Sequence, residues 1–182
     1  MIPLKANSDT PDNKAKSELL KDAQRGNAHA QFLLGQRYLL GWGIGKDEAE
    51  AVKWWRQSAA QGDAGSENAL GAAYRFGSGV SRDYSEAVKW FRMAAVHGDS
   101  LAQFNLGEMY LNGQGVAQNR EEAKKWYKKS SVKGYKRSCE AYRKLNAARK
   151  SVSEIAAVPP EKRPLYLGIR SSHQKFFQRQ PS

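Results

Sequence analysis

The chain has 182 residues, of which 40% are hydrophobic, and its formal net charge at pH 7 is +12. No apolar stretch approaches the length of a membrane-spanning helix, and the N-terminal residues lack the apolar segment of a secretory signal peptide. A single cysteine, Cys139, excludes an intramolecular disulfide and indicates a reducing compartment, so we predict a cytoplasmic protein.

The first predicted element is a lone helix over residues 12–25. Its Leu19 and Ala23 match Trp55 and Ala59, which lie 36 residues further along the chain in the second helix of a repeated unit. A stack of repeats exposes apolar surface at its ends unless a helix covers it. We therefore predict that this helix caps the N-terminal end of the stack.

Three segments of 36 residues follow, and they align with one another without a gap. Self-similarity at a period in the thirties is typical of solenoids built from helix pairs. Residues that recur in all three copies are assigned to the fold, so function is sought where the copies differ. The predicted repeats lie at about 28–63, 64–99 and 100–135, and the recurring residues include Gly35, Gly71 and Gly107, then Tyr38, Tyr74 and Tyr110, then Trp54, Trp90 and Trp126.

The first half of each repeat predicts a helix, which we call helix A. In the first copy Ala30, Leu34 and Tyr38 are four residues apart and therefore lie on one helical face. Glycine inside a helix costs about 1 kcal/mol relative to alanine, so the recurrent Gly35 needs a steric reason. We predict that a neighbouring helix packs against its bare backbone.

The second half of each repeat predicts helix B. It begins with a capping box, in which the Asp47 side chain accepts from an amide of the first turn and Glu50 reaches back to the amide of Asp47. Ala51 and Trp55 belong to an amphipathic stripe, and Gly62 supplies the left-handed residue that ends the helix.

A glycine-rich loop joins the two helices. Gly41 and Gly43 permit the positive backbone angles of a tight connection, and Ile44 is predicted to fill the gap between helices A and B. Glycine-rich loops also bind phosphate, but this loop follows a helix instead of a strand and recurs in every copy. We therefore assign it to the fold.

The pattern that begins at Ala30, Ser66 and Ala102 resembles the Sel1-like repeat, a relative of the tetratricopeptide repeat. This resemblance covers residues 30–135 and implies an all-α fold, a right-handed α-solenoid of antiparallel helix pairs with helix A on the concave face. Members of the family resemble adaptors that assemble protein complexes, often in bacterial signalling, envelope or virulence pathways. The third copy departs most from the pattern, at Asn119, Ser130, Ser131 and Tyr135.

The stack is predicted to end with a capping helix A at 136–150, because Ser138 and Tyr142 take the positions of Ala102 and Leu106. Beyond it, prolines and a loss of periodicity indicate a basic tail that is partly disordered. The predicted organisation is a flexible N-terminus at 1–11, a solenoid at 12–150 and the tail at 151–182.

Positive charge is concentrated near the C-terminus. Residues 1–119 contain 13 Lys and Arg against 13 Asp and Glu, whereas residues 120–182 contain 17 against 5. Such a patch is typical of an electrostatic binding surface for nucleic acid, anionic lipid or an acidic protein, and equally of a solvated end cap. The patch comprises Lys124, Lys125, Lys128, Lys129, Lys133, Lys136, Arg137, Arg143 and Lys144.

If helix A lines the concave face, its variable positions are candidates for a partner-binding groove. Each phenylalanine in this set has the alternative of packing against the next repeat, and Trp42 has the alternative of folding over Leu39 or Leu40. The groove candidates are His29, Phe32, Gln36, Asn68, Ala72, Arg75, Leu101, Phe104 and Glu108, with Trp42 on the adjoining loop.

The histidines and the cysteine show no spacing typical of a metal site or a catalytic nucleophile. We predict no catalytic residue, metal or cofactor. The predicted function is that of a monomeric, non-catalytic adaptor for a protein or peptide, with an acidic partner favoured by the basic end. The alternative is binding of nucleic acid or an anionic surface through that end.

Overall fold

The computed structural model describes residues 11–157, with side chains from 16 to 147. This part of the chain is helical and contains no strand. Its helices are α1 (Pro11–Gln24), α2 (Ala28–Leu40), α3 (Glu48–Ala59), α4 (Ala64–Phe76), α5 (Tyr84–Val96), α6 (Ser100–Asn112), α7 (Arg120–Val132) and α8 (Lys136–Ala157). The predictions for residues 1–10 and for the tail beyond 157 lie outside the described residues.

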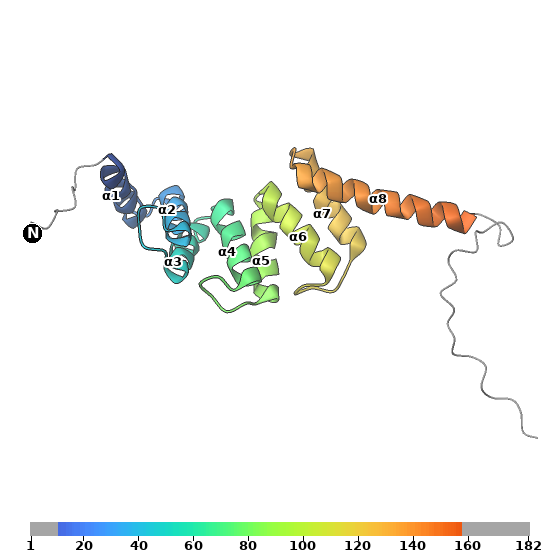
Figure 1. The fold of residues 1–182 in the computed structure, drawn as a ribbon, viewed down its shortest axis with the longest axis horizontal. Coiled ribbons are helices and arrows are strands. Elements are labelled where there is room, and N and C mark those ends of the chain that lie inside the picture. The colour runs from blue at the N-terminus through green and yellow to red at the C-terminus, as the bar shows by residue number, and fades with distance from the viewer. Residues whose placement is uncertain (1–10, 158–182) are drawn as a thin grey trace, which may run out of the picture. The chain divides into compact units, whose positions relative to one another are not determined.

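The helices form three antiparallel pairs, with α2, α4 and α6 as helices A and α3, α5 and α7 as helices B (Figure 1). Consecutive pairs meet through α3 and α4 and through α5 and α6, and α1 packs against α2. The predicted all-α solenoid is therefore confirmed. The chain divides into two compact units, the first ending at Lys144 and the second beginning at Leu145 inside α8.

The glycine inside each helix A is required by an aromatic ring of the helix B in the same pair. A Cβ atom on Gly35 would lie 2.4 Å from the indole nitrogen of Trp55, far inside van der Waals contact. Gly71 stands in the same relation to Phe91, at 2.5 Å. The predicted close approach of a neighbouring helix is confirmed, and the missing Cβ atom allows each ring to contact the backbone of helix A.

The predicted capping box forms only in part. The Asp47 carboxylate accepts from the Glu50 amide at 2.9 Å, as predicted. The prediction of the reciprocal contact from Glu50 to the Asp47 amide is wrong. The Asp47 amide donates to the Tyr38 carbonyl at 2.9 Å, and the Glu50 carboxylate pairs with Lys53 at 2.7 Å. Tyr38 lies in the last turn of α2, where the helix leaves carbonyl groups without partners, and the loop brings the cap amide back to one of them.

Contacts between successive repeats are made by the glycine-rich loop. Ile44, which was predicted to fill the gap within its own pair, packs in a cluster that includes Leu34 of α2 and Trp54 of α3, and this cluster extends to Ala23 of α1. At Gly79, whose φ is +70°, a Cβ atom would lie 2.1 Å from the Glu48 carbonyl oxygen of the preceding helix B. The loop thus contacts the first turn of helix B in the previous repeat, and the second glycine of the loop permits that close approach.

The predicted end of the C-terminal capping helix at 150 is wrong, because α8 continues to Ala157. The sequence between 136 and 157 contains no glycine or proline. Pro159 is the first proline after the start of α8, and a proline disfavours helical backbone angles at the residue that precedes it. Ser138 is fully buried and donates to the Ser130 hydroxyl at 2.7 Å, which seats the start of α8 against α7. Arg143 occupies the position that corresponds to Gly107. Its side chain covers the backbone that an aromatic ring of a further helix B would contact.

Candidate functional site

Exposed apolar side chains gather on helices A. Among the described residues, five of the eight large exposed hydrophobic side chains lie on α2, α4, α6 or the loop after α2. Phe76 is 71% exposed, Trp42 65% and Leu40 49%, and the other two are Leu33 and Leu101. Exposed apolar groups that share one side of a helical array are typical of a surface that binds another molecule.

One face of helix A carries these side chains. At 100° per residue, His29, Leu33, Gln36 and Leu40 fall on the side of α2 opposite its buried residues. The equivalent positions are Gly65, Ala69, Ala72 and Phe76 on α4, then Leu101, Asn105, Glu108 and Asn112 on α6, then Arg137, Ala141 and Lys144 on α8. We call this set of positions the helix A face.

Contacts across neighbouring helices A show that these rows lie side by side. A Cβ atom on Gly65 of α4 would lie 3.2 Å from the Phe32 ring of α2. The Asn105 amide nitrogen of α6 donates to the Asn68 side-chain oxygen of α4 at 3.1 Å. The helix A face is therefore continuous from the first to the third repeat.

Several predicted groove residues take part in these internal contacts. Phe32 is half-buried against the next repeat, and the Phe104 ring lies 5.6 Å from that of Tyr127 and 5.4 Å from that of Tyr135. Asn68 holds Asn105, as described above. Phe32 packs against the next repeat, which was the alternative considered for it. Phe32, Phe104 and Asn68 therefore present only part of their surface to a partner.

The hydroxyl group of Tyr127 is bound by Glu108 and influenced by the charge of Arg75. The Tyr127 hydroxyl donates to the Glu108 carboxylate. Burial, together with this carboxylate, raises the pKa of Tyr127, and the positive charge of Arg75 acts in the opposite direction. Arg75 also lies 5.4 Å above the Phe76 ring, so a cation adjoins the exposed aromatic side chain that α4 contributes to the helix A face.

Leu33, Leu40 and Phe76 are exposed candidate residues that were not predicted from the sequence. Leu40 and Phe76 share one register, and α6 has Asn112 there, so variation between the copies was the available signal. Trp42 was singled out by that signal, and its side chain is exposed. Gln36 lies on the same face and is half-buried.

The basic residues are spread around α7 and the start of α8. Lys125, Lys128 and Lys129 project outward from α7, and Lys125 pairs with Glu122. The Lys133 ammonium group donates to the Gly98 carbonyl at 2.6 Å, which ties α7 to the preceding repeat. The remaining cations are Lys124, which lies 6.0 Å above the Tyr142 ring, and the exposed Lys136, Arg137, Arg143 and Lys144.

Two of these cations extend the helix A face. Arg137 and Lys144 stand at the registers of Leu101 and Glu108, and both are exposed. The face therefore changes from apolar on α2 and α4 to cationic at the start of α8.

A family model of the Sel1 repeat matches residues 28–63, 64–99 and 100–135. A comparison with curated proteins found no match. Among solved structures, the chain is similar to a Sel1 repeat protein from Oxalobacter formigenes, with 35% identity, a TM-score of 0.66, and coverage of 72% of this chain and 98% of that one.

The chain is also similar to c5321, a protective antigen present in uropathogenic Escherichia coli strains that displays an SLR fold. The two are 36% identical with a TM-score of 0.68, and the match covers 69% of this chain but only 27% of c5321. Cysteine rich protein B of Helicobacter pylori shares the fold at 20% identity, with a TM-score of 0.59 and coverage of 74% of this chain and 99% of that one. None of α1–α8, as far as the structure describes them, is long and apolar enough to cross a membrane.

Proposed function

This chain belongs to the Sel1 repeat family, and we propose that it is a non-catalytic adaptor that binds a protein or peptide on its helix A face. Sel1 repeats are a non-enzymatic scaffold class and generally mediate protein–protein interactions. The observation that carries the proposal is the row of exposed apolar side chains at positions where the copies differ. The fold does not need these side chains, since at each of these registers at least one other copy places a small or polar residue.

Leu40, Trp42 and Phe76 are the anchors of this surface. They are the most exposed apolar side chains on helices A and the adjoining loop, and Arg75 lies against the Phe76 ring. Aromatic side chains and arginine contribute most strongly to binding energy at protein interfaces. A partner with apolar side chains buries them against this row.

The cationic end of the face favours an acidic segment in the same partner. Arg137 and Lys144 follow the apolar rows in register, and both are exposed. Carboxylates of the partner placed there gain electrostatic attraction, which steers association and fixes direction more than it adds affinity. The partner is therefore a segment that is apolar along α2 and α4 and acidic near α8.

The single cysteine of the chain supports a reducing compartment such as the cytoplasm. Fractionation of cells that express the native gene tests this part of the proposal. Recovery of the protein with secreted or envelope fractions would contradict it.

Site-specific photo-crosslinking tests the binding surface directly. A photoreactive phenylalanine analogue is placed at position 40 or 76 of the full chain, and cells that produce the protein are irradiated. Positions 96 and 132 serve as controls, because Val96 is 72% exposed, nearly the same as Phe76, but belongs to a helix B. We expect the same partner to be captured from positions 40 and 76 and from neither control.

Substitution of the anchors then measures their contribution. Phe76→Ser is expected to weaken binding of the captured partner at least tenfold, because hot-spot aromatic residues contribute about 1.4 kcal/mol or more. Val96→Ser removes a similar exposed area from a helix B and is expected to leave binding unchanged. Equal crosslinking at all four positions, or equal affinity of the two variants, would refute the helix A face as the binding surface.

A further inference from the structure

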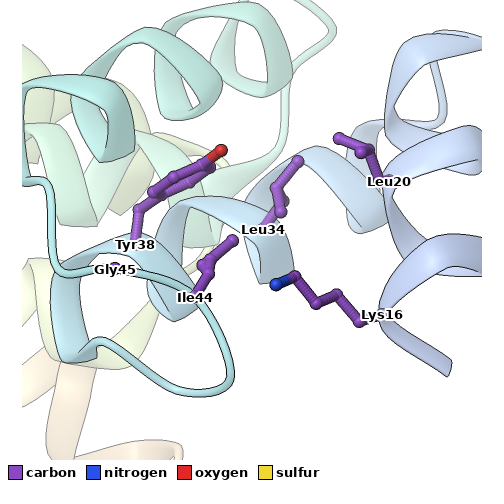
Figure 2. A pocket seen from close by; sticks show the side chains of 6 residues that line it. All are labelled: Lys16, Leu20, Leu34, Tyr38, Ile44 and Gly45. Carbon is purple, nitrogen blue, oxygen red and sulfur yellow. The ribbon is translucent and has the colours of Figure 1, made fainter. Parts of the chain in front are cut away.

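A cavity lies where α1 packs against the first repeat. Its volume is about 260 Å³, and one of the side chains that line it, Leu34, is fully buried. Figure 2 shows residues of α1 on one side and residues of α2 and its following loop on the other. The lining residues are Lys16, Leu20, Leu34, Tyr38, Ile44 and Gly45.

At the two equivalent junctions between repeats, a buried apolar side chain fills the space that corresponds to this cavity. The position of Lys16 is occupied 36 and 72 residues later by Val52 and Val88. These valines are only 3% and 5% exposed and belong to the hydrophobic core. A lysine at the same register does not bury its charged end in that space, since an ammonium group loses its hydration there.

At the position of Leu20 the exchange is reversed, because the α1 junction has an apolar residue where the other junctions have a charged one. The equivalents of Leu20 are Arg56 and Arg92. Arg56 donates to the Tyr74 hydroxyl at 2.7 Å, and Arg92 makes the same bond in the next junction at 2.8 Å. Tyr38 is the corresponding tyrosine at the first junction, and Leu20 has no group that donates to it. One polar group therefore remains on an otherwise apolar wall.

A positive charge stands at the edge of the same cavity. The Lys16 ammonium group donates to the Gly43 carbonyl at 2.6 Å, which holds the side chain over the loop. Lys53, Lys89 and Lys125 each pair with a glutamate, whereas no carboxylate between residues 16 and 147 pairs with Lys16. An anion that approaches this edge meets a cation that is not already neutralised by those residues.

We infer that this cavity binds a small organic acid with an apolar body, such as a short-chain acyl or arylalkyl carboxylate. The apolar body lies against Leu20, Leu34 and Ile44, and the carboxylate pairs with the Lys16 ammonium group. At roughly 30 Å³ for each water-sized group, about 260 Å³ has room for roughly nine such groups. This size fits a phenyl ring with a short acid chain.

The inferred site does not depend on the proposed partner surface. It is built by α1, α2 and the loop that follows α2, and none of its lining residues belongs to the apolar row on helices A. A ligand at this site and a partner on the helix A face are therefore separate tests.

Titration of the full chain with 3-phenylpropionate, followed by NMR of the isoleucine and leucine methyl groups, tests the inference. We expect saturable shifts centred on Ile44, Leu20 and Leu34. The neutral alcohol 3-phenyl-1-propanol keeps the apolar body and loses the charge, so its affinity is expected to be at least fivefold weaker. Acetate keeps the charge without the body and is expected to shift none of these signals.

The chain supplies its own control variant. Lys16→Val with Leu20→Arg gives the first junction the residues of the other two, so this variant is expected to fold and to lose binding at least tenfold. Lys16→Met alone tests the charge if the double variant unfolds, and it is expected to weaken binding of the acid fivefold or more while sparing the alcohol. Lys53→Met, on the exposed side of α3, is expected to bind as the natural protein does.

Absence of saturable shifts at Ile44 in the natural protein would overturn the inference. Equal affinity of the double variant would also overturn it, since the ligand would then bind elsewhere. Equal affinity for the acid and the alcohol would refute the assignment of the ligand as a carboxylate.

Discussion

The junction between α1 and the first repeat and the two junctions between repeats share one register but keep different contacts. At the α1 junction the Gln31 amide donates to the Ala23 carbonyl at 3.0 Å, but the bond from arginine to tyrosine is missing. The last junction has both, since Gln103 donates to Ala95 at 3.1 Å and Arg92 donates to its tyrosine. A solenoid junction thus tolerates the loss of one contact while the others remain.

The middle junction has lost the other contact. Glu67 stands at the register of Gln31 and Gln103, and it is fully buried. One carboxylate oxygen lies 2.8 Å from the His97 ring nitrogen, and the other has no hydrogen-bond partner among the described residues. The α1 junction and the middle junction each lack a different polar contact, while the close approach of the glycine-rich loop to the preceding helix is found at both junctions between repeats, at Gly79 and Gly115.

The largest effect is expected from breaking that loop contact. Gly79→Ala places a Cβ atom 2.1 Å from the Glu48 carbonyl oxygen at a φ of +70°, so the junction has to separate. We expect the free energy of unfolding to fall by about 3 kcal/mol. Chemical denaturation followed by circular dichroism measures this change.

Gly62→Ala is the matched control for Gly79→Ala. Gly62 has a similar φ of +82°, but a Cβ atom there meets nothing within 4 Å. Only the left-handed backbone conformation is penalised, so a loss of about 1 kcal/mol is expected. Equal losses in the two variants would show that the loop contact is not what joins the repeats.

A smaller effect is expected from repairing the middle junction. Glu67→Gln supplies the amide donor that Gln31 and Gln103 use, and the Ala59 carbonyl is the equivalent acceptor. The variant also removes a buried oxygen that lacks a partner. We expect the free energy of unfolding to rise by about 1 kcal/mol.

Combining this change with His97→Gln copies the first repeat, where the Gln61 amide donates to Gln31 at 2.9 Å. Thermal unfolding of the single and double variants compares them, and the double variant is expected to be at least as stable as the natural protein. A loss of stability in both variants would mean that the pair of Glu67 and His97 stabilises the middle junction.

The smallest effect is expected from exchanging the arginine contact. Arg56→Leu gives the middle junction the residue of α1 and removes the bond to the Tyr74 hydroxyl. Because Arg56 is exposed, we expect a loss of only about 0.5 kcal/mol. Tyr74→Phe removes the same bond from the other side, so the two changes are expected to be non-additive in a double-mutant cycle. Additive losses would indicate that the bond contributes no stability.

Most of the fold was predictable because its signals are local or repeated. The period of 36 residues fixes the pairs, and the recurring glycines at 35 and 71 indicate where a helix B ring approaches. The exposure of the candidate site residues was predicted less well. Phe32 and Phe104 were chosen for their variable register, but both are half-buried in contacts with other parts of the protein, whereas the more exposed Leu40 and Phe76 were not among the candidates.

The sequence by itself determined the family pattern, the helices, the left-handed glycine of each loop and the side-chain cap of helix B. These features depend on residues within one turn of each other or on a pattern repeated three times. Only the tertiary structure decided which apolar side chains stay exposed, which carbonyl receives the cap amide, and where the exchange of Lys16 and Leu20 leaves a cavity. Those outcomes depend on how distant segments fill the space beside a residue, and one register in a sequence carries no measure of that space.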